Sequence, residues 1–447
     1  MDSPITKTHK KGFHLFKLHA EETDDGYLNK IPIFQFILLS CLFPMWAAAA
    51  SLNDILITQF KTIFTLSNFA SAFVQSAFYG GYFLIAIPAS LVIKKTSYKI
   101  AILIGLLFYT GGCMLFFPAS TMATYGVFLA ALFAIAIGLS FLETSANTYS
   151  SLLGPEKTST LRLNISETFY PVGAITGILM GKYMIFGSGA SLEKQMAGMS
   201  GAQKIAFGEQ ALQKTLTPYK YIIVVLIIAI IVFALTEFPN SKPKGGSSVK
   251  SAKISETLKY LAHNKEYKKG IFTQFMYIGM QTAVWSFTIR LAMSLNGSIN
   301  ERDASTFMIF SYIAFFLGKM VANFLMKKFS PSRILLWFSI IGSLALIYII
   351  FVHNMTAVYA AILTSGLFGP CWATIYSKTL DTVKDKRHTA TAGAIIVMSI
   401  IGGSFIPLIQ GLAADSLHSM SYSFVVSLVS FVVVIIYSVD QIKHNNL

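Results

Sequence analysis

Three carboxyl groups lie within long apolar stretches of the sequence. Asp54, Glu143 and Glu167 each fall inside a run of about twenty mostly apolar residues, and the one other acidic residue within such a run, Glu237, lies at its very end. A charge at the centre of a lipid bilayer costs about 2.5–3.5 kcal/mol on insertion scales, so each of these acids needs a reason to be there. A structural reason is that a carboxyl group can join two helices or lie at the membrane interface. The other interpretation is a proton site.

The proton interpretation follows from the physics of burial. A low-dielectric environment favours the protonated form of a carboxyl group, which can then release its proton when water reaches it from the other side. One charge that crosses 100 mV is worth about 2.3 kcal/mol, enough to concentrate a neutral solute roughly fiftyfold. We expect Glu143 and Asp54 to be the proton-coupling residues. Glu167, near the predicted start of its helix, is open to either interpretation.

Polar and aromatic side chains share single faces of several apolar runs. Gln274, Tyr277, Gln281 and Trp285 recur at spacings of three and four, which places them on one stripe of a helix. Amide groups can bond hydroxyl groups while flat rings stack on C–H faces, which suits a sugar site, although packing is the alternative. Other candidates for substrate binding are Gln75, Tyr79, Asn147, Glu167, Tyr170, Lys319, Trp372 and Tyr376.

Lys319 is a candidate for a buried cation, because it lies inside another apolar run, directly after Gly318. Its side chain could extend to the membrane surface, pair with a carboxylate, or bond a substrate hydroxyl. The sequence contains no P-loop and no zinc motif, and all eight His residues lie outside the apolar runs. We therefore expect no enzymatic activity, no metal site and no cofactor, with the proton as the coupling ion.

Membrane-spanning helices must position these residues. Hydrophobic residues make up 54% of the 447 residues and charged residues only 12%, which is too little charge for a soluble surface. Three Cys residues exclude a disulfide scaffold. Apolar runs of about twenty residues predict twelve spans. They lie near residues 32–58, 70–93, 100–118, 124–150, 163–187, 219–238, 270–293, 304–326, 333–352, 356–377, 390–412 and 420–439.

The basic residues indicate how the spans are oriented. If both termini are cytoplasmic, the cytoplasmic segments hold 26 of the 35 Lys and Arg residues, the opposite side holds six, and three lie within spans. This asymmetry follows the positive-inside rule. It also explains the net charge of +15 without a nucleic-acid partner, because the basic residues are scattered over many short loops. We expect a monomer in the cell (inner or plasma) membrane, with the lipid bilayer as its surroundings.

The predicted spans divide into two sets of six. Residues 239–269 form the longest cytoplasmic break and are rich in Pro, Gly and Ser at their start, which is typical of a linker. The sequence thus predicts an all-α membrane protein with two six-helix bundles, a layout that brings a substrate to their interface at mid-membrane. The expected segments are a tail (1–31), the first bundle (32–238), the linker (239–269), the second bundle (270–439) and a second tail (440–447).

Several long segments resemble the fucose:proton symporter family of the major facilitator superfamily. The resemblance is carried by LNDIL (Leu52–Leu56), QSAFYGGYF (Gln75–Phe83), FLETSAN (Phe141–Asn147), LRLNISETF (Leu161–Phe169) and QFMYIGMQTAVWSFTIR (Gln274–Arg290), and it covers the chain from about residue 30 onward. It implies a major facilitator fold and a rocker-switch transporter that moves a monosaccharide inward with a proton. The resemblance makes Glu143 the proton carrier and Asp54 a nearby acid needed for transport. It also places Lys319 and Trp372 toward the central cavity.

The sequence departs from the family pattern at three polar positions. The family has Gln and then Asn where this sequence has Glu167 and Tyr170, and its Asn three residues before the aspartate is Ser51 here. We include Ser51 among the expected substrate-binding residues. The resemblance favours L-fucose as the substrate, while glucose, galactose, mannose and N-acetylglucosamine stay open. A facilitator or exporter of a non-sugar solute, and a sensor that binds without transport, are the remaining alternatives.

Overall fold

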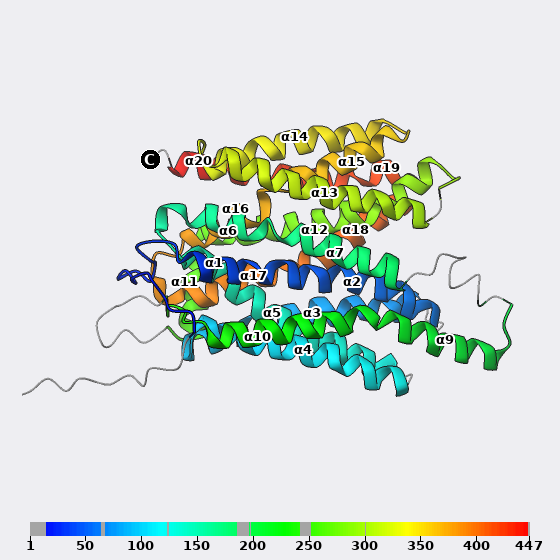
Figure 1. Cartoon of the computed structure of the whole chain (residues 1–447). Coiled ribbons are helices and arrows are strands. Elements are labelled where there is room, and N and C mark those ends of the chain that lie inside the picture. The colour runs from blue at the N-terminus through cyan, green and yellow to red at the C-terminus, as the bar shows by residue number, and fades with distance from the viewer. Residues whose placement is uncertain are drawn as a thin grey trace, which may run out of the picture.

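The computed structural model of the chain is a bundle of long helices that run side by side (Figure 1). It describes residues 15–63, 68–122, 125–185, 196, 198–241, 252–299 and 301–445, and these contain no β-strand. The helices of the first half are α1 (Ile33–Ser40), α2 (Leu42–Ile63), α3 (Asn68–Lys95), α4 (Tyr98–Met122), α5 (Tyr125–Leu152), α6 (Ser159–Glu167), α7 (Tyr170–Met180), α9 (Gly201–Thr215) and α10 (Thr217–Leu235).

The second half begins with a short helix and continues with long ones. Its helices are α11 (Ile254–His263), α12 (Lys265–Leu295), α13 (Glu301–Leu325), α14 (Pro331–Phe351), α15 (Thr356–Leu367), α16 (Cys371–Asp381), α17 (Thr389–Met398), α18 (Gly402–Ser416), α19 (Met420–Ser423) and α20 (Val425–Asn445).

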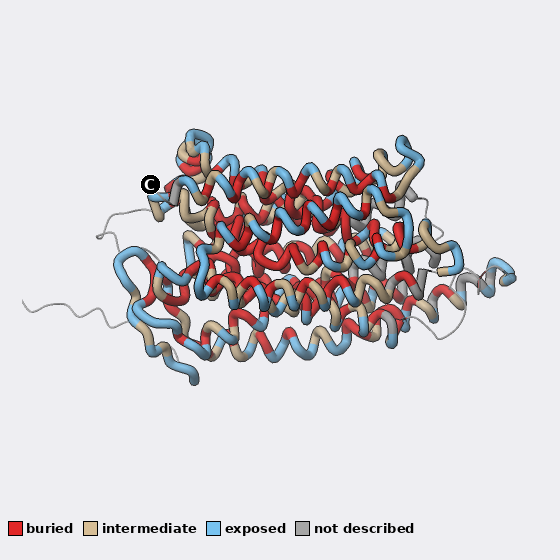
Figure 2. Tube along the Cα trace, turned by 90° about the horizontal axis from the view of Figure 1, so that it is seen from above, coloured by how far each residue is buried: buried red, intermediate tan, exposed pale blue. Residues whose placement is uncertain are grey.

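The exposed residues lie on the outside of the bundle and the buried ones inside it (Figure 2). Many of the exposed residues are large and apolar. Leu84, Ile228, Leu344, Leu408 and Ile436 each expose more than half of their surface although they lie in the middle of long helices. An apolar belt of this kind is suited to lipid rather than water. Nine helices or helix pairs of the described part are long and apolar enough to cross a membrane.

The twelve predicted apolar runs all fall mainly on helix. Three of them, near 70–93, 163–187 and 270–293, are not among the nine candidate spans. The run near 163–187 is interrupted between α6 and α7, and the run near 270–293 carries the polar stripe. Only part of the run near 70–93 has described side chains.

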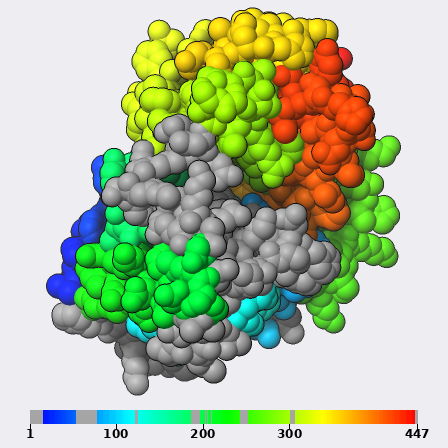
Figure 3. Space-filling view, turned by 90° about the vertical axis from the view of Figure 1, so that its right-hand side faces the viewer, coloured from blue at the N-terminus to red at the C-terminus, as the bar shows by residue number. Residues whose placement is uncertain are grey.

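Both ends of the described chain lie at the same end of the bundle, which we call the terminal end (Figure 1). Leu15 N–H donates to Leu235 O at the end of α10, and Lys269 at the start of α12 pairs with Asp440 in α20 at 2.6 Å. Figure 3 shows the opposite end, where α14 (yellow) and α9 (green) lie across the molecule from each other.

Close packing holds each half together. In the first half α5 packs on α3 and α4, and α2 packs on α7; in the second, α12 packs on α18 and α20, and α13 packs on α15. Small residues allow these approaches. A Cβ added at Gly173 of α7 would collide with the backbone of Pro44 in α2, and one added at Gly318 of α13 would collide with the backbone of Gly366 in α15.

The two halves meet along a second set of contacts. Helix α17 packs on α3 and α5, α16 packs on α6, and α13 packs on α6 and α7. Three of the helices at this interface belong to broken spans: α6 and α7 are separated at Thr168–Phe169, and α16 starts after a break at Pro370. Pro171 and Pro370 explain the breaks, because proline cannot continue the hydrogen bonding of a preceding helical turn.

The segment between the halves contains more helix than its composition indicates. Within the predicted linker 239–269, α11 forms and α12 already begins at Lys265. Helix α11 is held at the terminal end by its neighbours in the second half. Thr257 Oγ1 lies 2.7 Å from His388 Nδ1, and Asn264 Nδ2 donates to Thr382 O at 3.0 Å.

Candidate functional site

Helix α5 carries Glu143 into the middle of the bundle. From Gly138 to Leu152 every residue of this helix is buried, as expected of a helix surrounded by others. Small residues on α5, such as Ser140 and Ala146, let neighbouring backbones approach. The Glu143 side chain is only 6% exposed and lies within electrostatic range of Glu167 and beside the Tyr82 hydroxyl of α3.

One turn beyond Glu143, α5 presents polar atoms that have no partner in the described part of the chain. Asn147 is fully buried, and neither its amide nitrogen nor its amide oxygen makes a hydrogen bond. The hydroxyl groups of Thr144 and Ser145 are unpaired as well. Leaving a buried polar group unsatisfied costs about 1–3 kcal/mol, so these atoms would gain from bonding water or a polar ligand.

Glu167 and Lys319 connect the two halves. Glu167 is the last residue of α6, and Lys319 lies in α13, where Gly318 brings α13 against α15. Glu167 Oε2 and Lys319 Nζ are 3.6 Å apart, with the side chains 6% and 1% exposed. Lys319 Nζ also lies 4.7 Å from the centre of the Phe315 ring. We call Glu143, Glu167 and Lys319 the central charge cluster.

Tyrosine side chains surround the central charge cluster. Tyr170 begins α7, and its ring meets Phe315 of the second half edge-on, with 6.5 Å between the ring centres. Tyr170 lies within electrostatic range of Glu143, Glu167 and Tyr79. Tyr79 of α3 is half-buried beside Phe78. Both predicted Tyr residues therefore reach the region of the buried acids.

The predicted stripe of α12 is a buried face of that helix. Gln274, Tyr277, Gln281 and Trp285 are all buried. Gln281 Nε2 donates to the Tyr277 hydroxyl at 2.8 Å, and Trp285 Nε1 donates to Ser365 Oγ at 3.1 Å. The stripe is therefore partly satisfied by packing within the second half. Gln274 donates to the backbone oxygen of residue 372 at 3.4 Å and leaves its own Oε1 unpaired.

Trp372 and Tyr376 of α16 face the first half. Trp372 is 5% exposed, and its Nε1 lies beside the Glu167 carboxylate without a hydrogen bond of normal geometry to any described residue. The Tyr376 hydroxyl is 2.8 Å from Thr148 Oγ1 of α5. Trp372 thus belongs with the central charge cluster, while Tyr376 joins the halves one turn farther toward the terminal end.

The remaining predicted residues lie on α2 and α3. Ser51 of α2 is buried, donates to Ala48 O at 3.1 Å and contacts the position of Gly177 in α7. It therefore packs inside the first half. The side chains of Asp54 and Gln75 lie outside the described residues.

Comparison with known proteins places this geometry in a family. The sequence profile of the Major Facilitator Superfamily matches residues 36–298 and 270–443. The chain is 33% identical over 420 residues to the L-fucose-proton symporter of Escherichia coli (strain K12), an alignment that covers 94% of this chain and 95% of that protein. The chain belongs to the fucose:proton symporter family of the Major Facilitator Superfamily.

Two further similarities support the family. A solved structure of the transporter FucP in the outward conformation superposes with a TM-score of 0.83 at 33% identity, covering 92% of this chain and 99% of that one. The glucose/galactose transporter of Brucella abortus biovar 1 (strain 9-941) is 27% identical over 386 residues, which are 86% of this chain and 88% of that one. The all-α major facilitator fold expected from the sequence is confirmed.

Three residues near the central charge cluster were not selected from the sequence. Phe315 packs on Lys319, Tyr312 packs on Trp285 with ring centres 4.6 Å apart, and Asn323 Nδ2 donates to Thr168 Oγ1 across the halves at 2.6 Å. Residues 315, 319 and 323 recur every four positions on α13, so they share one helical face. The spacing of four residues on either side of the single Lys in this apolar run is the sequence signal from which residues 315 and 323 could have been selected.

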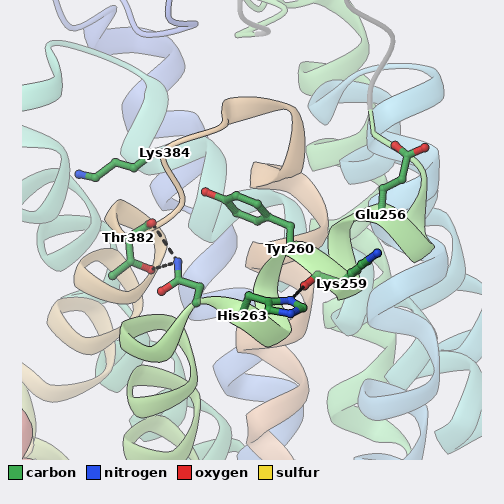
Figure 4. A pocket seen from close by; sticks show the side chains of 7 residues that line it. Glu256, Lys259, Tyr260, His263, Thr382 and Lys384 are labelled. Atoms are coloured by element: carbon green, nitrogen blue, oxygen red, sulfur yellow. Dashed lines mark hydrogen bonds between the residues drawn. The ribbon is translucent and has the colours of Figure 1, made fainter.

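A separate cavity of about 620 Å³ lies at the terminal end (Figure 4). It is lined by α11 and by the loop after α16, namely by Glu256, Lys259, Tyr260, His263, Asn264, Thr382 and Lys384. None of these belongs to the predicted site, and both signs of charge are present. In the described part of the chain no group of His, Cys, Asp or Glu could hold a metal ion.

Proposed function

We propose that the chain is a proton-coupled monosaccharide symporter that works by alternating access, with L-fucose as the leading substrate. The observation that carries the proposal is the buried Glu143 beside polar atoms without partners, at the interface of the two halves. A relative of this chain in E. coli is named an L-fucose-proton symporter, and the alignment of the two proteins spans nearly the whole of both chains.

The proposed topology has twelve spans with both termini cytoplasmic, in the cell (inner or plasma) membrane. The two bundles are residues 32–238 and 270–439, joined by the linker 239–269. The positions of the chain ends and the excess of basic residues at the terminal end support this arrangement. We propose that the chain is a monomer. We also propose that it has no nucleic-acid partner, because the positive charge is distributed as membrane topology requires.

Glu143 is the proposed proton carrier, and Asp54 is the proposed second acid. Glu143 is deeply buried and has no cation paired with it among the described residues, whereas Glu167 faces Lys319. A buried acid without a paired cation is neutral in its protonated form, which lowers the cost of carrying it through a membrane. The proton is then the coupling ion, and no other cofactor is needed.

The proposed sugar site lies between the halves. Asn147, Gln274 and Lys319 offer unpaired polar atoms there, and Trp372, Tyr170 and Tyr79 offer rings. Ser51, Gln75, Gln281, Trp285, Tyr277 and Tyr376 remain candidates, with Trp285 and Tyr376 already bonded to protein partners.

Contacts at the terminal end must break for the site to open toward the cytoplasm. Tyr376 meets Thr148, Thr160 Oγ1 lies 2.7 Å from Ser377 Oγ, and Asn164 Nδ2 donates to Thr374 Oγ1 at 3.4 Å. Each bond joins a helix of the first half to α16. The likeness to a structure in the outward conformation agrees with a terminal end that is closed.

A second candidate is transport of another hexose or of a non-sugar solute. The relative in Brucella abortus is named a glucose/galactose transporter. Glu167 stands where the family resemblance leads us to expect Gln, so the pocket chemistry differs from the pattern of fucose transporters. Glucose, galactose, mannose and N-acetylglucosamine are the other sugars to test.

The proposal is tested by sugar-dependent proton flux into proteoliposomes. L-fucose, glucose, galactose, mannose, fructose and N-acetylglucosamine are added one at a time, and the external pH is followed. We expect alkalinisation outside with L-fucose, because proton and sugar enter together. A response to another hexose alone would keep the mechanism and change the substrate. Silence with every sugar from correctly folded protein would contradict the proposal.

A further inference from the structure

The charged groups of Glu167 and Lys319 are too far apart to satisfy each other's hydrogen-bonding capacity. Charge-assisted hydrogen bonds between an ammonium and a carboxylate measure about 2.7–2.9 Å, whereas Nζ and Oε2 are 3.6 Å apart here. Both side chains are almost completely buried. Lys319 Nζ makes no hydrogen bond to any described residue, although an ammonium carries three donors.

A second unpaired donor lies at the same place. Trp372 Nε1 has no hydrogen bond within the described chain, and its indole lies near the Glu167 carboxylate. Removing two charges from water costs several kcal/mol for each ion unless hydrogen bonds satisfy their remaining donors and acceptors. The pair therefore requires a small polar group that can donate to Glu167 and accept from Lys319.

We propose that Glu167 and Lys319 act as one unit that holds a hydroxyl group of an uncharged sugar and rejects sugars that carry a charge. The inference rests on the proposed transport function and deepens it. A hydroxyl group has one donor and two acceptor lone pairs, so it can donate to the Glu167 carboxylate and accept from the Lys319 ammonium. The site thus selects the uncharged members of the sugar class.

Charged sugars are rejected because the cluster holds both signs. A sugar carboxylate that pairs with Lys319 displaces Glu167 and comes near Glu143. A sugar ammonium that pairs with Glu167 comes close to the ammonium of Lys319 and is repelled by it. Each ligand leaves one buried charge without its partner, which is strongly unfavourable. Specificity here comes from repulsion as well as from the hydroxyl bond.

The pair also separates substrate selection from proton coupling. Lys319 compensates Glu167, so Glu167 can stay charged throughout the cycle. Glu143 has no cation paired with it among the described residues and can take up and release the proton. Glu167 therefore adds no second proton to the cycle.

The test compares three sugars that share one ring. Binding of D-galactose (uncharged), D-galacturonate (anionic) and D-galactosamine (cationic) to the purified full chain is measured by isothermal titration calorimetry, with L-fucose as the reference. The variants are Glu167→Gln, Lys319→Gln and the double variant. Lys269→Gln is the matched control, because Lys269 pairs with Asp440 inside the second half, away from the cluster.

The wild type should bind the uncharged sugars and neither charged one. Glu167→Gln introduces the residue that the family resemblance leads us to expect here, and its amide oxygen can still accept from a hydroxyl group, so uncharged sugars should still bind. The variant should also bind galacturonate, since Lys319 has lost its carboxylate. Lys319→Gln should bind galactosamine, since Glu167 has lost its ammonium partner. The double variant leaves no unpaired charge and is expected to fold even where a single variant does not. It should bind all three galactose derivatives weakly, with affinities within about threefold of one another.

Two results overturn the assignment, and they are distinguishable. If the variants lose affinity for uncharged sugars but still reject both charged ones, the pair is structural and the assignment alone is wrong. If the wild type binds no uncharged sugar, the proposed function is wrong and the assignment with it. Lys269→Gln should match the wild type with every ligand.

Discussion

Arg162 shows how one buried side chain fixes the end of the helix that carries Glu143. Its guanidinium donates to Pro155 O and Thr158 Oγ1 at 2.6 Å, to Gly154 O at 3.1 Å, to Ser150 O at 3.3 Å, and to Ser151 O. The side chain is 1% exposed. A cation at a helix C-terminus also opposes the negative end of the helix dipole. Arg162 therefore positions α5 from the terminal end.

Replacing Arg162 with Ala should destabilise the fold. The change leaves several buried carbonyl groups without a donor, so we expect the free energy of unfolding to fall by about 2–4 kcal/mol. The measurement is reversible denaturation of the detergent-solubilised protein. Lys157→Ala is the matched control, because Lys157 is exposed in the same loop and should change stability little. Equal stabilities of the two variants would show that Arg162 does not hold α5.

Single residues differ in how well the sequence predicts them. Glu143 is recognisable because an acid in an apolar run is rare, and the structure buries it. Arg162 looks in the sequence like one more basic residue of a cytoplasmic loop. Its burial depends on the turn at Gly154, where φ is +154° and a Cβ would lie 3.0 Å from the guanidinium. No periodic pattern records such a turn.

Helices α5, α16 and α17 meet at the point where the halves must separate. The Tyr376 hydroxyl bonds Thr148, and a Cβ added at Gly393 of α17 would lie 2.5 Å from Thr148 Oγ1 and 2.7 Å from that hydroxyl. The three helices are therefore closely packed where the two halves meet at the terminal end. Each hydrogen bond across them stabilises the closed arrangement by about 0.5–1.5 kcal/mol.

Replacing Tyr376 with Phe should shift the equilibrium toward opening of the terminal end. Loss of one such hydrogen bond changes the population ratio roughly twofold to tenfold. Distances between spin labels at the exposed positions Lys95 and Lys384 report the opening. Tyr437→Phe makes the same change inside the second half, where Tyr437 bonds Thr379 at 3.2 Å, and should leave the distances unchanged. Identical distance distributions in both variants would contradict the role of Tyr376.

At the scale of elements, the sequence predicts helices better than their breaks and contacts. The stripe of α12 follows helical spacing, so its buried face is predictable. The breaks at Thr168–Phe169 and before α16 arise where proline follows in runs that otherwise look continuous. Contacts such as Thr148–Tyr376 join residues 228 positions apart, and local spacing holds no information about them.

The whole molecule combines an apolar outer belt with a polar interface between its halves. Buried acids are stable there only if each is neutral or paired, and the two acids with described side chains illustrate the two solutions: Glu167 faces Lys319, and Glu143 does not face a described cation. A transporter of this design converts the proton gradient into a sugar gradient only if the unpaired acid changes its protonation state in each cycle.

The most direct measurement is uptake of labelled L-fucose into proteoliposomes with an imposed proton gradient, for the wild type and Glu143→Gln, alongside exchange without a gradient. The exposed Glu21 provides the control variant Glu21→Gln. We predict that the wild type and Glu21→Gln accumulate sugar above equilibrium, while Glu143→Gln still exchanges sugar but does not accumulate it. Full accumulation by Glu143→Gln would contradict the assignment of Glu143 as the proton carrier.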